Sequence, residues 1–309
     1  MSQTQSSPTA IQWVIDTRPL WPLALETKDL TTSVSVSLTA LSLILILSPQ
    51  ASRALSLLTT EEQAAVMRYY HVRDAKLALA SALLKRYVIS RFCQVPWSEA
   101  KTTRDVRTKP VFISPSGDEP LIFNISHQAG LAVLLAVHNP PEGLAVGVDV
   151  VCPTERRDRD LRSLADEGWP SFVDMHADVF GPGEVAALKH MNPGTAISER
   201  DCALRYFYAL WCLREAYVKM TGDALLASWL KDLEMRDFAP PEDMRKVQEA
   251  WLRGIKVDGV DLKLMPFLEE YMISTAVRHG LNGETIDLKD FQSLDIEEIL
   301  TFGERLPSS

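Results

Sequence analysis

Two long stretches without glycine or proline constrain the fold of this chain of 309 residues more than any other feature. Residues 59–92 begin with two threonines and two glutamates and continue mainly with Ala, Leu, Lys and Arg, which predicts one long helix or two abutting helices. Residues 201–221 also lack helix breakers and stop at Gly222, a pattern typical of a helix C-terminus. We therefore expect a core built around two separate long helical segments.

Strand-like runs lie before, between and after these helices. Apolar runs bounded by Pro, Gly and Asn predict strands at 12–16, 121–125, 131–138, 144–151 and 272–278. Because helices and strands are grouped rather than alternating one by one, we predict an α+β fold of two similar halves. The halves are placed at residues 11–145 and 146–280, and residues 281–309 are expected to form an acidic tail of low order.

Charge and composition exclude several classes of partner. The formal net charge is −9, so no global positive field would attract nucleic acid. The first ten residues are polar and do not resemble a signal peptide. None of the cysteines has the spacing of a metal site, which favours a reduced, cytoplasmic protein in which they are packing residues; they are Cys93, Cys152, Cys202 and Cys212.

An uncharged apolar insertion lies at residues 30–52. Its length would suit a membrane span, but many Ser and Thr residues dilute it and no aromatic belt or basic cluster flanks it. The sequence favours an embedded helix or strand over a membrane span or an irregular insertion. We therefore expect no membrane partner.

The second long helix carries charges on a largely apolar face. Trp211, Glu215 and Lys219 follow one another at intervals of four residues, so they line one side of the helix. A carboxylate and an ammonium group on such a face are costly unless they are paired or bind something ionic. The simpler interpretation, a Glu–Lys pair on the helix surface, stays open at this point.

A single carboxylate interrupts the aliphatic run at residues 146–151. Asp149 lies near the end of the predicted strand, and Gly147 lacks a side chain, so another group can approach the backbone there. Asp149 could equally cap the following turn. Two carboxylates on rigid elements, Asp149 and Glu215, would suit Mg²⁺ shared with substrate phosphates.

Polar groups able to bind phosphate follow the strand predicted at 121–125. The run Phe-Asn-Ile-Ser-His-Gln at 123–128 contains Asn124, Ser126 and His127, all of which can donate hydrogen bonds to phosphate oxygens. A single histidine is more often structural. A basic loop at 101–109 precedes this strand and could supply positive charge.

Together these motifs resemble the 4′-phosphopantetheinyl transferases of the larger, pseudodimeric type. The motifs are Phe-Asn-Ile-Ser-His-Gln at 123–128, Val-Gly-Val-Asp at 146–149 and Trp-Cys-Leu-Arg-Glu-Ala-Tyr-Val-Lys at 211–219. The resemblance covers about residues 13–278. It is strongest to fungal broad-specificity members, through Tyr-Tyr-His at 69–71, Lys-Pro at 109–110 and the segment 221–229.

The resemblance implies a fold and an activity. It implies two similar α/β halves related by a pseudo-twofold axis, with the active site between them. It implies a holo-[acyl-carrier-protein] synthase that moves the phosphopantetheine arm of coenzyme A to a serine of apo acyl or peptidyl carrier domains. Such domains occur in polyketide synthases, nonribosomal peptide synthetases and aminoadipate reductase, which link the activity to secondary metabolism and lysine biosynthesis. By the same resemblance, Mg²⁺ is the cofactor and the chain is a monomer.

The resemblance also implies roles for individual residues. Asp149 and Glu215 match the Mg²⁺ ligands, and Glu215 is our choice for the base that accepts the serine proton. Lys219 matches the lysine that contacts the phosphate on the pantetheine side. Ser126 and His127 match the pair that holds the 3′-phosphate of coenzyme A.

Further residues follow from the same comparison. Lys109 matches the position beside the adenine and its phosphates, and Arg104 and Arg107 lie in the same basic loop. Asn124 belongs to the run that contains the phosphate-binding pair. Glu184 matches the acid of the family's F-S-x-x-E motif, which makes it an additional candidate for metal binding or proton removal.

The sequence departs from the family pattern at three positions. Arg214 stands where the family usually has lysine, and a guanidinium fork makes different contacts from a point charge. Val151 replaces a third acidic ligand of some bacterial members, so water or phosphate would complete the metal site. Gly181 replaces the usual hydroxyl residue after Phe180, which weakens the match at Glu184.

Two other classes of function use the same residues. A Mg²⁺-dependent phosphohydrolase or nucleotidyl transferase could use Asp149 and Glu215, but no further acidic cluster or P-loop supports it. A catalytically degenerate paralogue that only binds carrier domains is the alternative outside enzymes, because the apolar insertion could disrupt the N-terminal half.

Overall fold

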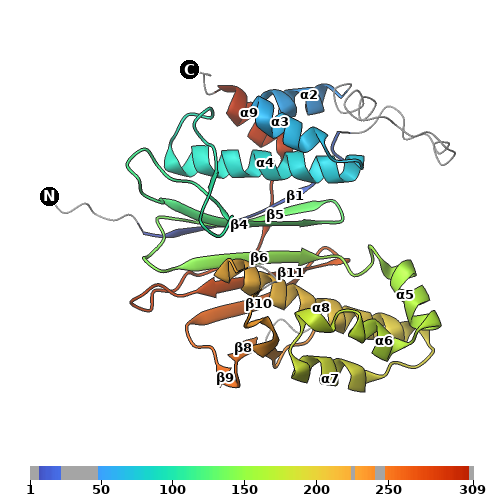
Figure 1. Cartoon of the computed structure of the whole chain (residues 1–309). Helices are drawn as coiled ribbons and strands as arrows, with labels where there is room; N and C mark the ends of the chain where they lie inside the picture. The colour runs from blue at the N-terminus through green and yellow to red at the C-terminus, as the bar shows by residue number, and fades with distance from the viewer. Residues whose placement is uncertain (1–6, 22–47, 224–226, 241–247, 306–309) are drawn as a thin grey trace. The chain divides into compact units, whose positions relative to one another are not determined.

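The computed structural model describes residues 7–21, 48–223, 227–240 and 248–305. The chain forms two compact units, each with its own core: unit 1 is Met1–Asn139 with Leu288–Ser309, and unit 2 is Pro140–Asp287. Each unit contains an antiparallel sheet covered by a long helix, which gives the α+β composition expected from the sequence (Figure 1).

Unit 1 is built on a sheet with the strand order β12-β1-β5-β4, in which only the β1–β12 pair is parallel. The strands of this sheet are β1 (Thr9–Asp16), β4 (Leu121–Gln128), β5 (Leu131–His138) and β12 (Gln292–Ser293). A separate two-stranded sheet contains β2 (Thr103–Arg104) and β3 (Pro110–Val111). The helices of unit 1 are α2 (Pro49–Ser56), α3 (Thr60–Met67), α4 (Val72–Cys93) and α9 (Ile296–Arg305). The helical segment expected at 59–92 is therefore two helices.

Helix α4 covers the sheet of unit 1 and buries one face in its core. Leu79, Leu83 and Tyr87 are fully buried and belong to one apolar cluster with Trp13 of β1 and Phe123 of β4. The start of α3 is fixed by a capping box, in which Thr59 and Glu62 satisfy one another's backbone amides.

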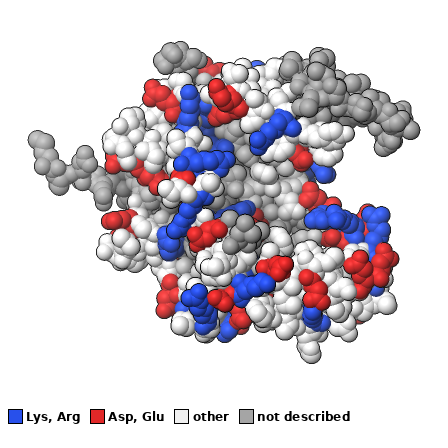
Figure 2. Space-filling model, viewed as in Figure 1, with Lys and Arg blue, Asp and Glu red and all other residues white. Residues whose placement is uncertain are grey.

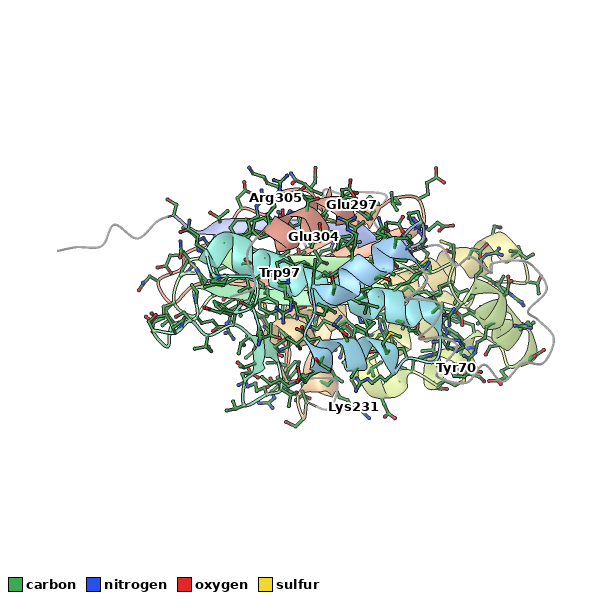
Figure 3. All side chains as sticks on the ribbon, turned by 90° about the horizontal axis from the view of Figure 1, so that it is seen from above. Tyr70, Trp97, Lys231, Glu297, Glu304 and Arg305 are labelled. Atoms are coloured by element: carbon green, nitrogen blue, oxygen red, sulfur yellow. The ribbon has the colours of Figure 1, made fainter. Side chains whose placement is uncertain are left out.

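The C-terminal segment corrects the expectation of a tail of low order. Its apolar residues Ile296, Ile299 and Leu300 are buried in the core of unit 1, so the spacing is that of an amphipathic helix. Glu297 and Glu304 line the exposed side of α9 and both pair with Arg53 of α2 (Figure 3). Three of the acidic residues of this segment, Glu297, Glu298 and Glu304, lie on the solvent side of α9.

Unit 2 contains a three-stranded sheet with the order β10-β11-β6 and a smaller sheet with the order β7-β8-β9. Its strands are β6 (Ala145–Val151), β7 (Leu233–Arg236), β8 (Glu249–Leu252), β9 (Ile255–Lys256), β10 (Val260–Phe267) and β11 (Tyr271–Arg278). Its helices are α5 (Arg157–Asp166), α6 (Trp169–Asp174), η1 (Ala177–Val179), α7 (Pro182–Met191), α8 (Ile197–Thr221) and η2 (Leu230–Asp232). The sequence missed β7 to β10.

Helix α8 lies on the three-stranded sheet of unit 2, directly over β6 (Figure 1). A Cβ atom at Gly147 would be 2.1 Å from the carbonyl oxygen of Ala216 and 2.5 Å from the amide nitrogen of Met220. The missing side chain therefore lets the two backbones touch, as expected for this glycine. Because side chains alternate along a strand, Asp149 points to the same helix-facing side as position 147.

The apolar insertion predicted at residues 30–52 lies mostly outside the described residues. Only Ser48–Ser52 of it is described, and there Ser48 caps the first turn of α2. Among the helices that the structure describes, none is long and apolar enough to cross a membrane. Basic and acidic side chains are intermixed on the face seen in Figure 2.

The close approach at Gly147 predicts a large loss of stability for Gly147→Ala. The added methyl group meets helix backbone, which cannot move aside, so we expect a loss of about 3 kcal/mol or more in the free energy of unfolding. Gly194→Ala is the matched control, because the atom nearest to its added Cβ is the carboxylate of the exposed Glu199 side chain. Urea denaturation measures both; an equal effect of the two variants would contradict the packing described here.

Candidate active site

The predicted site residues of unit 2 come together where α8 crosses β6. Asp149 is only 5% exposed. Its carboxylate oxygen Oδ1 accepts a hydrogen bond from Lys219 Nζ at 2.6 Å. The ammonium group of Lys219 thus bridges helix and strand, which goes beyond a Glu–Lys pair along the helix surface.

Glu215 lies close enough to this pair for their charges to act on it. Its pKa is raised, first by burial and then by the negative charge of Asp149, while Lys219 and Arg214 oppose the increase. Two carboxyl groups that repel one another in a buried place are costly unless a cation stands with them. The structure therefore brings together three of the residues selected from the sequence: Asp149, Glu215 and Lys219.

Cys212 is fully buried next to Asp149. Its thiol lies 3.6 Å from the carbonyl oxygen of Asp149 and 3.7 Å from that of Met272. Burial raises its pKa well above the usual value, so it stays a neutral thiol. Cys93, Cys152 and Cys202 are also free thiols, and Cys202 is exposed.

The residues around Asp149 fit a hydrated Mg²⁺ ion. Mg²⁺ keeps several waters and needs only one or two protein carboxylates. Ser274 faces Asp149 across the β6–β11 pair, is fully buried, and its hydroxyl has no hydrogen-bond partner among the described residues. A buried hydroxyl without a partner costs about 1–3 kcal/mol, and a water on a cation held by Asp149 would satisfy it.

Glu184 does not join this group. Its Oε2 accepts hydrogen bonds from Gly181 N at 2.8 Å and Arg214 Nη1 at 2.6 Å, and its Oε1 accepts one from Met235 N at 2.6 Å. Within the described part of the chain, no group of three His, Cys, Asp or Glu side chains could hold a metal ion. In this structure the oxygens of Glu184 serve a buried ion pair and two backbone amides, and its part in metal binding or proton removal stays a prediction.

The predicted phosphate-binding residues of unit 1 are only partly grouped. The strand was expected to end at residue 125, but β4 continues to Gln128 and pairs with β5 throughout. Asn124 and Ser126 are buried on one face of the sheet, whereas His127 is exposed on the other face, because side chains alternate. Ser126 and His127 therefore point in opposite directions.

The basic loop of unit 1 is held by its own backbone contacts. Asp105 accepts hydrogen bonds from the backbone amides of Arg107 and Lys109, at 2.9 and 2.8 Å. Arg104 Nη1 donates to the carbonyl oxygen of Thr108 at 2.6 Å. Arg104 and Arg107 are exposed and Lys109 is half-buried, so the loop presents cations on an ordered turn.

The fold and the site define a class: an α+β protein in which a buried aspartate, a half-buried glutamate and a lysine lie together at the crossing of a helix and a strand. Residues 47–139 match the family model "4′-phosphopantetheinyl transferase, N-terminal", and residues 145–258 match the model "4′-phosphopantetheinyl transferase superfamily". The chain belongs to the 4′-phosphopantetheinyl transferases, a family of enzymes, which confirms the assignment made from the motifs.

Full-length relatives support this membership. The chain is 73% identical over 305 residues to 4′-phosphopantetheinyl transferase 1 of Fusarium mangiferae, which covers 99% of both chains. It is 32% identical over 345 residues to the 4′-phosphopantetheinyl transferase of Aureobasidium melanogenum, covering 92% of this chain and 94% of that one. The human L-aminoadipate-semialdehyde dehydrogenase-phosphopantetheinyl transferase is 29% identical over 168 residues, covering 53% and 48%.

Sequence reasoning missed two residues at this site. Ser274 carries no motif, and only the strand register places it opposite Asp149. Arg214 was named but given no role, because its partners Leu230, Leu233 and Glu184 come from other elements. Alternation in residues 272–278 could have shown that Ser274 is a hydroxyl on a buried strand, but not what it faces.

The closeness of the two carboxyl groups predicts a coupling between their titrations. We expect Asp149→Asn to lower the pKa of Glu215 in the metal-free protein, because the substitution removes a negative charge while Lys219 and Arg214 remain. Carbon-13 NMR of the glutamate side-chain carboxyls against pH measures the change. Asp261→Asn, on β10 of the same unit, is the control. An unchanged or higher pKa of Glu215 would show that the two groups do not interact.

Proposed function

We propose that this chain transfers the 4′-phosphopantetheine arm of coenzyme A to a serine of apo carrier domains and releases adenosine 3′,5′-bisphosphate. The observation that carries the proposal is the grouping of Asp149, Glu215 and Lys219 on α8 and β6. Membership of the transferase family supports the reaction type. Polyketide synthase, nonribosomal peptide synthetase and aminoadipate reductase domains are the proposed acceptors. Relatives named for aminoadipate-semialdehyde dehydrogenase support the last of these.

Coenzyme A brings about four negative charges to a chain whose own net charge is −9. Local cations must therefore bind it. We propose that Arg104, Arg107, Lys109 and His127 of unit 1 bind the adenosine and its 3′-phosphate, with Asn124 and Ser126 as hydrogen-bond donors from the same strand. Ser126 and His127 face opposite sides of β4, so they would approach the ligand from different directions.

Asp149 and Glu215 are the proposed ligands of Mg²⁺, with water and phosphate oxygens in the remaining positions. When bound, the ion would neutralise charge on the pyrophosphate of coenzyme A. Lys219 already lies at the Asp149 carboxylate, so it is placed to exchange that partner for a phosphate oxygen. Its positive charge then offsets charge that develops on the leaving bisphosphate.

Glu215 is the proposed proton acceptor, directly or through a bound water. The serine hydroxyl of the carrier forms a bond to the β-phosphorus, and the bond from that phosphorus to adenosine 3′,5′-bisphosphate breaks. The proton of the hydroxyl passes to Glu215. In the metal-free protein, burial and the charge of Asp149 raise the pKa of this carboxyl. We further propose that the chain works as a cytoplasmic monomer.

Incubation of the protein with an apo-carrier domain, coenzyme A and Mg²⁺ tests the function, with the mass gain of a phosphopantetheine arm as the readout. We expect Asp149→Ala and Glu215→Ala each to slow transfer by about 100-fold or more, the scale of one lost electrostatic contact in an active site. Asp261→Ala, which removes an exposed carboxylate from the same unit, should transfer normally. Near-normal transfer by Glu215→Ala would refute its role, and carrier binding without a mass gain would favour a binding protein.

His127→Ala tests the assignment of the 3′-phosphate. Loss of a hydrogen-bond donor at this phosphate should raise KM for coenzyme A but leave KM for dephospho-coenzyme A nearly unchanged, because the second donor lacks that phosphate. Steady-state kinetics with both donors measure the difference. His138→Ala, at the end of β5 in the same unit, is the control. Equal damage with the two donors would remove the 3′-phosphate from the role of His127.

A further inference from the structure

Arg214 directly precedes Glu215 on α8, yet its side chain makes a separate set of contacts. It is 2% exposed. Its Nη1 donates to Glu184 Oε2 at 2.6 Å and to the carbonyl oxygen of Leu233 at 2.7 Å, and its Nη2 donates to the carbonyl oxygen of Leu230 at 2.5 Å. One guanidinium group thus joins α8 to α7, to η2 and to β7.

Glu184 completes the same network from the other side. Besides Arg214, it accepts hydrogen bonds from the backbone amides of Gly181, at the start of α7, and Met235, in β7. Gly181 is itself tightly enclosed, since a Cβ there would lie 2.7 Å from the carbonyl oxygen of Leu233. The pair therefore fixes backbone positions on three elements rather than two side chains alone.

A buried ion pair such as Arg214–Glu184 adds little to the free energy of unfolding. Burying two charges costs about as much as their attraction returns, and apolar replacements of both partners are often neutral or stabilising. What a buried arginine that donates to three acceptors provides is defined geometry. Because Arg214 is next to a proposed metal ligand, we infer that it helps to hold that ligand in place.

The relevant motion is a roll of α8 about its axis. Adjacent residues project about 100° apart around a helix, so Arg214 and Glu215 leave α8 in different directions. Side-chain tips lie about 5 Å from the axis, so a roll of about 15° would move the Glu215 carboxylate by more than about 1 Å. A displacement of that size can cost two orders of magnitude in an active site.

We propose that Arg214 and Glu184 are positioning residues that fix the roll of α8 and so set the place of Glu215 relative to Asp149. The proposal rests on the proposed function in that Glu215 and Asp149 are taken as the ligands of the divalent cation. It assigns one shared role to the acid of the F-S-x-x-E motif and to the cation before Glu215. Neither residue touches the substrate or the metal in this role.

Binding of Mn²⁺ to the purified protein, followed by electron paramagnetic resonance, tests the proposal without requiring transfer. We expect Arg214→Met to weaken Mn²⁺ binding by tenfold or more and to raise the metal concentration needed for half-maximal transfer. Arg214→Lys keeps a cation for Glu184 but loses the second donating nitrogen, so it should recover part of the affinity. If Arg214→Met binds Mn²⁺ like the wild type, or Arg214→Lys recovers nothing, the proposal fails.

Arg86 in unit 1 offers a matched control. It is also 2% exposed, pairs with Glu62 at 2.7 Å, and donates to the carbonyl oxygen of Trp97 at 2.8 Å. Arg86→Met should therefore lower the thermal midpoint about as much as Arg214→Met but leave Mn²⁺ affinity unchanged. Equal losses of affinity in the two variants would mean that Arg214 acts only through general stability.

The double variant Arg214→Met/Glu184→Leu distinguishes an effect on the position of Glu215 from an effect on the stability of the fold. Removing both charges should recover the thermal midpoint lost in Arg214→Met, while Mn²⁺ affinity stays at least tenfold low. Recovery of both quantities would overturn the proposal. If the wild type binds Mn²⁺ but transfers no phosphopantetheine, the proposed function fails. The Mn²⁺ affinities of the variants would still test whether Arg214 and Glu184 position Glu215.

Discussion

The direct contact between the backbones of α8 and β6 is the constraint on which the site depends. At Gly147 there is no room for even a methyl group against Ala216 and Met220. This closeness brings the helix residues within hydrogen-bond reach of a strand residue, so Lys219 meets Asp149 at 2.6 Å. With a side chain at position 147 the helix would have to lift away, and Asp149 would be separated from both Lys219 and Glu215. The glycine of the motif is thus as much a part of the site as its charged residues.

Electrostatics explains why these residues need one another. Asp149 is buried, and an uncompensated carboxylate there would be costly, so the ammonium group of Lys219 stands beside it. For Glu215 the nearby cations do not outweigh the opposing effects. Its pKa is raised by burial together with the charge of Asp149. A divalent cation would relieve that repulsion and free Lys219 for a phosphate. The proposed chemistry therefore follows from an imbalance of charge that is built into the folded chain.

Much of this arrangement was predictable from local pattern. The spacing of Glu215 and Lys219 placed them on one helix face, and Gly147 was expected to allow a close approach. Long-range partners were not predictable, because spacing says nothing about what faces a residue across a sheet or from another helix. Lys219 was expected to contact phosphate, and its bond to Asp149 appears only in the structure. Ser274 could be found only from the register of β11 on β6.

Two differences from the expectations have one physical cause: a charged residue in the sequence does not show which groups surround it in the fold. In α9 the acidic residues suggested disorder, yet Ile296, Ile299 and Leu300 bury enough apolar surface to order the segment on unit 1. At Glu184 an acid in a familiar motif suggested a metal ligand, yet Arg214 and two backbone amides already use its oxygens. A carboxylate is a candidate ligand only when its lone pairs are not required elsewhere. Applied to this chain, that condition separates Asp149 and Glu215, which remain candidates, from Glu184, which holds the helix that presents one of them.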